Sequence, residues 1–364
     1  MIRVQKNVNL PDTYPLERLG PLDEILFFDI ETTGFSGDST TLYLIGCTYY
    51  EHDSWNLVQW FADTLDSEEQ LLHEFFQFLT HYRYLVHFNG DGFDIPYLLK
   101  RCRHYGLDYD FSGVTSIDIY RKIRPYKKLL GMDSLKQKAV ERFLGISRKD
   151  LCSGGELIEV YKNYLHTRDS HMYDLLMLHN EDDLKGMPSI LPILNYPDFF
   201  ERPLSLAGKA VVKDSGLFEG SRFVLQLLCG SPVTLPVPFE KYSPLAACYA
   251  DGSQLTVLLP FYEGELKYFY PDYKNYYYLI YEDTSIHKSI AEYVDREARV
   301  KATAKTCYTR KQGYFIPQFQ PLWTPAFKKD YESRQTYAEY QDQLLCEDAE
   351  FQAYLKQVLD YLFA

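Results

Sequence analysis

The chain has 364 residues, of which 46% are hydrophobic and 24% charged, and its formal net charge is −13. This composition is that of a globular protein with room for two domains, and it excludes a disordered chain. The acidic balance argues against a protein that coats nucleic acid non-specifically, but it allows an acidic, metal-dependent enzyme with a local basic surface.

The cysteines and the apolar segments bear on the compartment. The seven cysteines are scattered without a CxxC pair, which predicts a reduced protein with neither a disulfide framework nor a zinc cluster. The N-terminal sequence lacks the apolar core of a signal peptide. No segment approaches the roughly 18 uninterrupted apolar residues of a membrane helix. We therefore expect a cytoplasmic protein with no membrane partner.

In the first half of the chain, strand patterns alternate with helix patterns. The segments that predict strands are ILFFDIE (25–31), TLYLIGCTYY (41–50), NLVQWFAD (56–63), YLVHFNG (84–90) and VTSIDIYRKI (114–123). Amphipathic helices are expected after Ser67, before Gly106 and in three later segments. The sequence thus predicts an α/β domain over residues 25–195, with a mixed five-stranded sheet flanked by helices, after an N-terminal extension of residues 1–24.

The second half has a different pattern. Three prolines in residues 192–206 mark a domain boundary. Beyond it, LAACYA, QLTVLLPFY, ELKYFYP and NYYYLIY alternate with turns, which predicts an α+β domain over residues 209–364 with an antiparallel meander. We also expect a helix over residues 286–302, a hairpin at Gln312–Gly313 and a mostly helical tail in two pieces from Asp330.

Acidic residues occur at three points where an element begins or ends. Asp29 and Glu31 are two apart on a strand and therefore share a face, where a divalent cation would relieve their repulsion. Asp94 begins a helix after a strand that ends in Asn-Gly, and Asp91 suits the role of helix cap better. His179 and Asp183 are four apart and share a helix face. Each fragment alone also fits a capping carboxylate or a solvated helix end.

Together, FFDIETTG, HFNGDGFD and HNEDD resemble, in order, the three motifs of the DEDD exonucleases of the RNase H-like superfamily. The segments after the second motif are similar to the YprB-like branch, and the resemblance covers about residues 25–194. It implies a metal-dependent 3′→5′ exonuclease acting on DNA or RNA. Asp29, Glu31, Asp94 and Asp183 would be catalytic residues that bind two Mg²⁺ or Mn²⁺ ions. His179 fills a slot in which the family has Tyr, and would orient or deprotonate the attacking water.

A locally basic region, residues 97–149, could hold a phosphate backbone, and a second stretch, residues 296–315, mixes basic and aromatic residues. Both stretches also fit ordinary solvated surfaces. We expect a nucleic-acid partner that is single-stranded or has a free 3′ end, bound in part by the second domain. The predicted substrate-binding residues are Thr32, Asn89, Phe93, Arg121, Arg124, Lys127, Lys128, Arg310 and Lys311.

Two alternatives stay open at this point. The first is an RNase H-like nucleic-acid-binding or scaffold protein whose catalytic site has decayed, which the net charge and the histidine at residue 179 favour. The second is an RNase H-like endonuclease, which differs only in making internal cuts. Asp118, at the end of a predicted strand, is either a carboxylate that supports the site or a surface residue.

Overall fold

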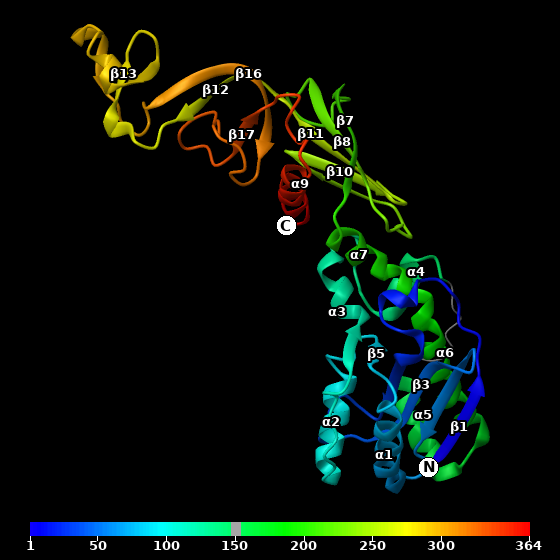
Figure 1. The fold of residues 1–364 in the computed structure, drawn as a ribbon. Coiled ribbons are helices and arrows are strands. Elements are labelled where there is room, and N and C mark those ends of the chain that lie inside the picture. The colour runs from blue at the N-terminus through cyan, green and yellow to red at the C-terminus, as the bar shows by residue number, and fades with distance from the viewer. Residues whose placement is uncertain (147–153) are drawn as a thin grey trace. The chain divides into compact units, whose positions relative to one another are not determined.

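The computed structural model describes residues 1–146 and 154–364 and divides the chain into two compact units, Met1–Asp198 and Phe199–Ala364 (Figure 1). Arg148, Lys149 and Cys152, which the sequence analysis counted among the basic residues and cysteines, lie outside the described residues. Within the described ranges, no helix is both long enough and apolar enough to cross a membrane.

Unit 1 is built on a six-stranded sheet in the order β1-β4-β3-β2-β5-β6. The strands are β1 (Ile2–Asn7), β2 (Ile25–Thr32), β3 (Leu42–Glu51), β4 (Ser54–Phe61), β5 (Tyr84–His87) and β6 (Thr115–Asp118). The pairs among β1, β4, β3 and β2 are antiparallel, whereas β5 runs parallel to both β2 and β6. The predicted mixed sheet is therefore confirmed, and β2 lies inside it, where its apolar run is covered on both faces.

The sixth strand comes from residues 1–24, which the sequence analysis treated as an extension. β1 pairs with β4 from Ile2 opposite Phe61 to Asn7 opposite Asn56. Its sequence, IRVQKN, has only two apolar residues in alternation, because an edge strand buries one face and meets a neighbour on one side only. Such a short pattern gave no strand signal.

Helices cover both faces of this sheet. They are α1 (Glu68–Leu79), α2 (Asp94–Tyr105), α3 (Ile119–Ile123), α4 (Gln137–Phe143), α5 (Gly154–Thr167) and α6 (Ser170–Ile190), and α7 (Asn195–Glu201) spans the boundary between the units. The α1 residue Phe75 stacks on Phe28, with ring centroids 5.7 Å apart. The next residue of β2, Asp29, points to the opposite face, on which α6 packs. The sheet thus separates an aromatic core from the carboxylate side of β2.

Unit 2 consists of three antiparallel sheets, with the strand orders β7-β8-β11-β10-β9, β12-β16-β17 and β14-β13-β15. The strands of the first sheet are β7 (Ser205–Lys213), β8 (Phe223–Gly230), β9 (Phe239–Ser243), β10 (Ala246–Asp251) and β11 (Gln254–Pro260). The other strands are β12 (Tyr262–Phe269), β13 (Tyr276–Leu279), β14 (Thr284–His287), β15 (Arg299–Lys301), β16 (Tyr308–Gln318) and β17 (Thr336–Glu339). The helices are α8 (Lys288–Ala291) and α9 (Asp348–Phe363). The α+β class of this part is confirmed.

Three local predictions for unit 2 were wrong. The helix expected over residues 286–302 is reduced to the four residues of α8, because residues 299–301 pair with β13 instead. The hairpin expected at Gln312–Gly313 does not form, since both residues lie in the middle of β16, where they pair with β12. The tail contains one helix, α9, and β17. In each segment, pairing with a strand distant in sequence overrides the local preference.

Candidate metal-binding active site

Asp29 and Glu31 lie at the end of β2, on the sheet face that α6 covers. Asp29 stands opposite Gly46 of β3, and Glu31 stands opposite Leu44, just before a bulge that ends the regular pairing. The side chain of Glu31 is only 13% exposed. The strand thus delivers two carboxylates, two residues apart, to one recessed position.

Asp94 reaches β2 from a later segment of the chain, the start of α2. It is the first residue of α2 and is 7% exposed. The backbone N–H of Ile30, between Asp29 and Glu31, donates a hydrogen bond to the Asp94 carboxylate. The expected cap, Asp91, does not cap α2, because its carboxylate is hydrogen-bonded to Ser116 and Arg121 instead.

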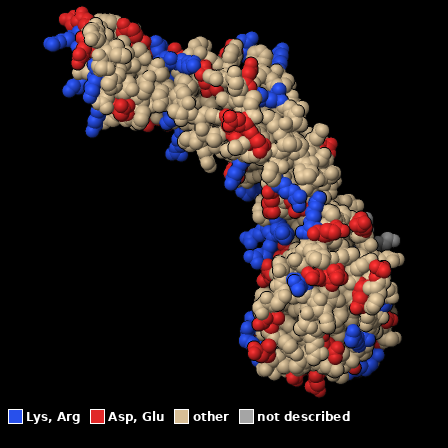
Figure 2. Space-filling view, viewed as in Figure 1, with Lys and Arg blue, Asp and Glu red and all other residues tan. Residues whose placement is uncertain are grey.

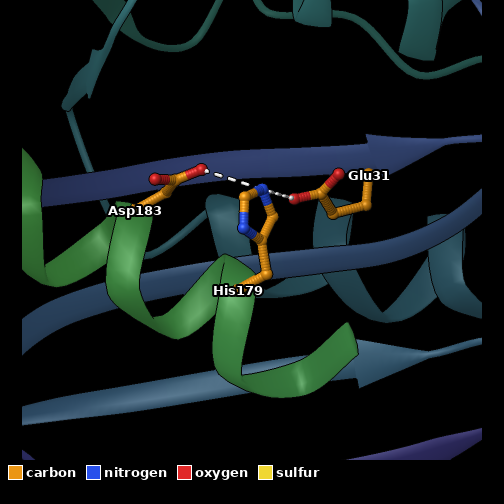
Figure 3. A group of neighbouring side chains, drawn as sticks. All are labelled: Glu31, His179 and Asp183. Atoms are coloured by element: carbon orange, nitrogen blue, oxygen red, sulfur yellow. Dashed lines mark ion pairs between the residues drawn. The ribbon is translucent and has the colours of Figure 1, made fainter. Parts of the chain in front are cut away.

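The helix α6 brings His179 and Asp183 to the same place. The His179 Nε2 atom lies 3.6 Å from Glu31 Oε1 and 3.4 Å from Asp183 Oδ2 (Figure 3). Ligand atoms of Glu31, His179 and Asp183 all lie within 4.8 Å of one another. Glu181 faces away from this group, and its carboxylate accepts a hydrogen bond from Lys6 Nζ at 2.6 Å. Asp183 is therefore the α6 carboxylate that reaches β2.

The electrostatics show that the four carboxylates form one cluster. Burial raises the pKa of Asp29 well above its usual value, and the charges of Glu31, Asp94 and Asp183 raise it further. Burial and the charges of Asp183 and Asp94 raise the pKa of Glu31 to about 8, against a smaller lowering by a hydrogen bond with Tyr43. Burial raises the pKa of Asp94 to about 7. These shifts are expected where like charges crowd without a counter-ion.

The cluster fits a divalent cation on chemical grounds. Mg²⁺ and Mn²⁺ prefer oxygen ligands and need only a few carboxylates besides water and substrate oxygen. A cation among Asp29, Glu31, Asp94 and Asp183 would remove the repulsion that, added to burial, raises the pKa values of Asp29 and Glu31. Of the described residues, Glu31, His179 and Asp183 are the one group whose ligand atoms are close enough to hold an ion jointly.

A predicted consequence concerns pH and stability without metal. In the folded chain the pKa of Glu31 is about 8 rather than 4.5, and that of Asp94 about 7 rather than 3.8. Between these values the folded chain holds protons that the unfolded chain has released, so stability is fully present at low pH and falls as pH rises from about 4 to 8. In EDTA, we expect unit 1 to unfold several degrees lower at pH 8 than at pH 5.5.

The check is thermal unfolding followed by circular dichroism at both pH values. A chain with Glu31→Gln and Asp94→Asn should lose the part of the difference that these two groups cause, because neither amide titrates, and keep the part that Asp29 causes. Adding Mn²⁺ at pH 8 should raise the melting temperature of the native chain and not that of the variant. A native chain that is equally stable at both pH values would contradict the crowding of these carboxylates.

Two buried amides hold Asp29, and sequence reasoning missed both. Asn180 Nδ2 donates to Asp29 Oδ2 at 3.0 Å, and Gln59 Nε2 donates to Asn180 Oδ1 at 2.9 Å. Asn180 is 0% and Gln59 1% exposed. Gly46 makes room for this contact, since a Cβ there would lie 2.0 Å from Asn180 Oδ1. The position of Asn180 directly after His179 was the one hint in the sequence that it belongs to the site, but a polar residue beside a motif usually faces solvent.

Asp118 supports the loop that carries Asn89 and Asp94. It is 4% exposed, and its carboxylate accepts hydrogen bonds from the backbone N–H groups of Asn89, Asp91 and Arg121 at 3.0–3.2 Å. Asn89 has a φ of 65°, a left-handed conformation that this anchor stabilises. Of the two roles open from the sequence, the supporting one is the one that the structure shows for Asp118.

We therefore expect Asp118→Ala to act through the loop. The change leaves three partly buried N–H donors without an acceptor, which costs roughly 1–3 kcal/mol of stability. Because the loop leads into α2 and Asp94, we also expect at least tenfold slower cleavage of a nucleic-acid substrate. The exposed Asp110, whose carboxylate accepts from Ser112 in a nearby turn, gives the control Asp110→Ala. Equal melting temperatures for the two variants would contradict the anchoring role.

Some of the predicted substrate-binding residues of unit 1 lie beside the carboxylate cluster, and the others lie on α3 or just after it. Phe93 and Thr32 lie at the site, where Phe93 precedes Asp94 and Thr32 ends β2. Phe35, which the sequence analysis did not single out, is 92% exposed, and its ring centroid lies 6.1 Å from that of Phe93. Arg121 binds Asp91 of the Asn89–Asp94 loop, with Nη1 and Oδ2 2.6 Å apart.

The remaining candidates lie further along the chain. Arg124, Lys127 and Lys128 follow α3 in a short 3₁₀ segment and the turn after it. In unit 2, Arg310 lies 3.4 Å from Glu265 and 3.6 Å from Asp283, and Lys311 lies 2.6 Å from Glu339. The charges of Arg310 and Lys311 are thus already compensated on the surface of the β12-β16-β17 sheet.

Comparison with known protein families identifies the fold of the unit that carries the carboxylates. Residues 26–195 match the family model of the RNase_H superfamily. The fold of unit 1 is RNase H-like. No curated protein sequence matches the chain.

Among solved structures, the chain is similar to the family B DNA polymerase from the hyperthermophilic archaeon Pyrobaculum calidifontis, with 14% sequence identity and a TM-score of 0.38. The match covers 69% of this chain and 35% of the polymerase, so the chain spans about a third of that protein's length. RNase H-like nucleases generally use divalent metal ions, in keeping with the carboxylate cluster of unit 1.

Proposed function

We propose that the chain is a metal-dependent 3′→5′ exonuclease that hydrolyses phosphodiester bonds of DNA or RNA, of the DEDD type and the YprB-like branch. The observation that supports this most is the convergence of Asp29, Glu31, Asp94 and Asp183 in an RNase H-like unit. Four carboxylates in one recess destabilise the metal-free fold, and a bound cation offsets that cost.

The residues divide the chemistry among them. When bound, two Mg²⁺ or Mn²⁺ ions would activate the water and stabilise charge on the scissile phosphate and the leaving 3′ oxygen. Asp29, Glu31, Asp94 and Asp183 would hold the ions, and Asn180 fixes one carboxylate oxygen of Asp29. His179 accepts a proton from the attacking water, which adds to phosphorus as the bond to the 3′ oxygen breaks.

Two aromatic rings, the exposed Phe35 and the half-buried Phe93, support a terminal, unpaired nucleotide as the substrate. Phe35 and Phe93 form an edge-to-face pair beside Asp94, and Phe35 is almost wholly exposed. An apolar ring in water at the rim of a phosphate-binding site gains free energy by stacking on an unpaired base. We therefore assign the binding of the 3′-terminal bases to Phe35 and Phe93, with Thr32 and Asn89 beside them.

The test is a cleavage assay with end-labelled single-stranded and double-stranded DNA and RNA in Mn²⁺. A 3′→5′ exonuclease shortens a 5′-labelled strand one nucleotide at a time, spares a circular strand and stops in EDTA. Internal cuts in the circle would instead identify an endonuclease. Absence of cleavage of every substrate in Mn²⁺ would contradict the proposal.

One observation favours a second candidate, a decayed RNase H-like nucleic-acid-binding or scaffold protein. The His179 Nε2 atom lies between Glu31 and Asp183, so a protonated imidazole could neutralise them without a metal. This reading predicts binding of nucleic acid that is unchanged by EDTA, together with no cleavage in Mn²⁺. The exonuclease reading predicts that Asp29 and Asp94, which His179 does not contact, still require a cation.

A further inference from the structure

Unit 2 contains a pocket on its smallest sheet, and the basic stretch of residues 296–315 singled out in the sequence supplies two of its cations, Arg299 and Lys301. The pocket has a volume of about 670 Å³ and lies where β13 meets α8 and β15. Figure 2 shows Lys and Arg side chains among acidic ones on the part of unit 2 labelled β13 in Figure 1. The lining residues that matter here are Tyr276, Tyr277, Lys274, Lys288, Arg299 and Lys301.

The pocket is basic, although the chain is acidic. Lys274, Lys288, Arg299 and Lys301 line it together with one carboxylate, that of Glu292. With the described carboxylates these four cations form no ion pair, unlike Arg310 and Lys311 on the neighbouring sheet. Lys288 Nζ is held by the neutral Asn275 Oδ1 atom at 2.9 Å. The positive charge of the pocket is therefore available to an anionic ligand.

Strand register puts an aromatic ring among these charges. Tyr277 of β13 stands opposite Lys301 of β15, and Leu279 stands opposite Arg299. Directly paired residues share a face, so Tyr277, Arg299 and Lys301 project to the same side of the sheet. The Arg299 guanidinium carbon lies 5.1 Å from the centroid of the Tyr277 ring. A tyrosine ring and a guanidinium plane both offer flat surfaces on which an unpaired base stacks.

We propose that this pocket is a binding site for single-stranded nucleic acid. Lys274, Lys288 and Lys301 contact phosphates, and the pair of Tyr277 and Arg299 stacks with a base. A duplex fits less well, because its bases are stacked on one another and cannot reach the ring. The inference rests on the proposed function, since it assigns to unit 2 the capture of the strand that unit 1 would digest.

The experiment measures binding apart from cleavage. A fluorescein-labelled oligo(dT), an oligo(rU) and a hairpin duplex are titrated with the full chain in EDTA, and fluorescence anisotropy is recorded at several salt concentrations. The pocket variant is Arg299→Glu with Lys301→Glu. We expect at least about tenfold weaker binding of both single strands. The slope of log affinity against log salt should fall by roughly 0.7, since Lys301 is the phosphate contact that this variant removes and each such contact contributes about 0.7.

The matched control is Arg334→Glu with Lys356→Glu, which also replaces one arginine and one lysine. It changes the net charge of unit 2 equally, and both side chains are exposed outside the pocket. A second variant, Tyr277→Leu, keeps the charge and removes the ring, and should weaken single-strand binding several-fold with the salt slope unchanged. Circular dichroism verifies that each variant is folded, and Arg299→Gln with Lys301→Gln replaces the reversal if it is not.

The inference is overturned if the pocket and control pairs weaken binding equally, or if the native chain binds the duplex as tightly as the single strands. Its failure is distinguishable from that of the proposed function. A chain that binds through this pocket but cleaves nothing in Mn²⁺ contradicts the nuclease proposal alone. A chain that cleaves, while the pocket variants bind like the native chain, contradicts this inference alone.

Discussion

Cleavage of a 5′-labelled oligonucleotide is expected to be at least about 10³-fold slower in the Asp29→Ala chain than in the native chain. The charges of the other three carboxylates all raise the pKa of Asp29, and the hydrogen bond from Asn180 fixes its orientation. Metal-ion stabilisation of charge in the transition state is worth several kcal/mol, and each 1.36 kcal/mol corresponds to a tenfold rate change. Loss of an ion should therefore lower the rate by about three orders of magnitude or more.

The control is Asp38→Asn in the exposed loop after β2. Asp38 is an accessible carboxylate that binds Lys100 Nζ at 2.6 Å, away from the cluster. Its loss should leave the cleavage rate unchanged. The Asp29→Ala chain should also be folded, which circular dichroism verifies. Full cleavage by Asp29→Ala would contradict its role as a metal ligand.

Replacement of His179 by alanine is expected to lower kcat by about 10²-fold or more. A positioned general base contributes 10²–10⁴-fold to a rate, and the His179 Nε2 atom lies within 3.6 Å of both Glu31 and Asp183, where the attacking water would be oriented. The Mn²⁺ concentration that gives half-maximal rate should change little. His179→Tyr should recover part of the rate, because the DEDD exonucleases, which the three motifs resemble, have tyrosine at this position.

The solvent-exposed His52, remote from this group in the β3–β4 turn, gives the matched control His52→Ala, which should cleave like the native chain. The readout is single-turnover cleavage across a range of Mn²⁺ concentrations. If higher Mn²⁺ restores the full rate of His179→Ala, the imidazole is a metal ligand and not the group that handles the water. An unchanged rate at every concentration would give His179 no part in the reaction.

The fold of unit 1 was accessible from the sequence because its inner strands are covered on both faces. A run such as residues 25–28 has no polar side, and such a run has few explanations other than a central strand. Asp29, Glu31 and Asp94 were accessible because they stand near the end of β2 or at the start of α2, whereas Asp183, inside α6, was accessible through its spacing from His179. Repulsion between them requires either separation or a cation, and their order along the chain resembles known motifs.

The parts that were missed depend on pairing between distant segments. Asn180, Gln59 and Asp118 are polar residues, which most often face solvent, and their burial follows only from the contacts they make with one another and with the backbone. In unit 2, residues 299–301 and 312–313 take their structure from β13 and β12. A short stretch of sequence carries no information on such distant partners, so its local pattern predicted a helix in one case and a hairpin in the other.

The central claim is that these acidic side chains share divalent cations, and calorimetric titration of the full chain with Mn²⁺ tests it most directly. The account predicts saturable binding of two ions at pH 8, uptake that displaces the proton that Glu31 still partly holds at this pH, and loss of binding in Asp183→Ala. Absence of a binding heat at millimolar Mn²⁺, or identical binding by Asp183→Ala, would contradict it.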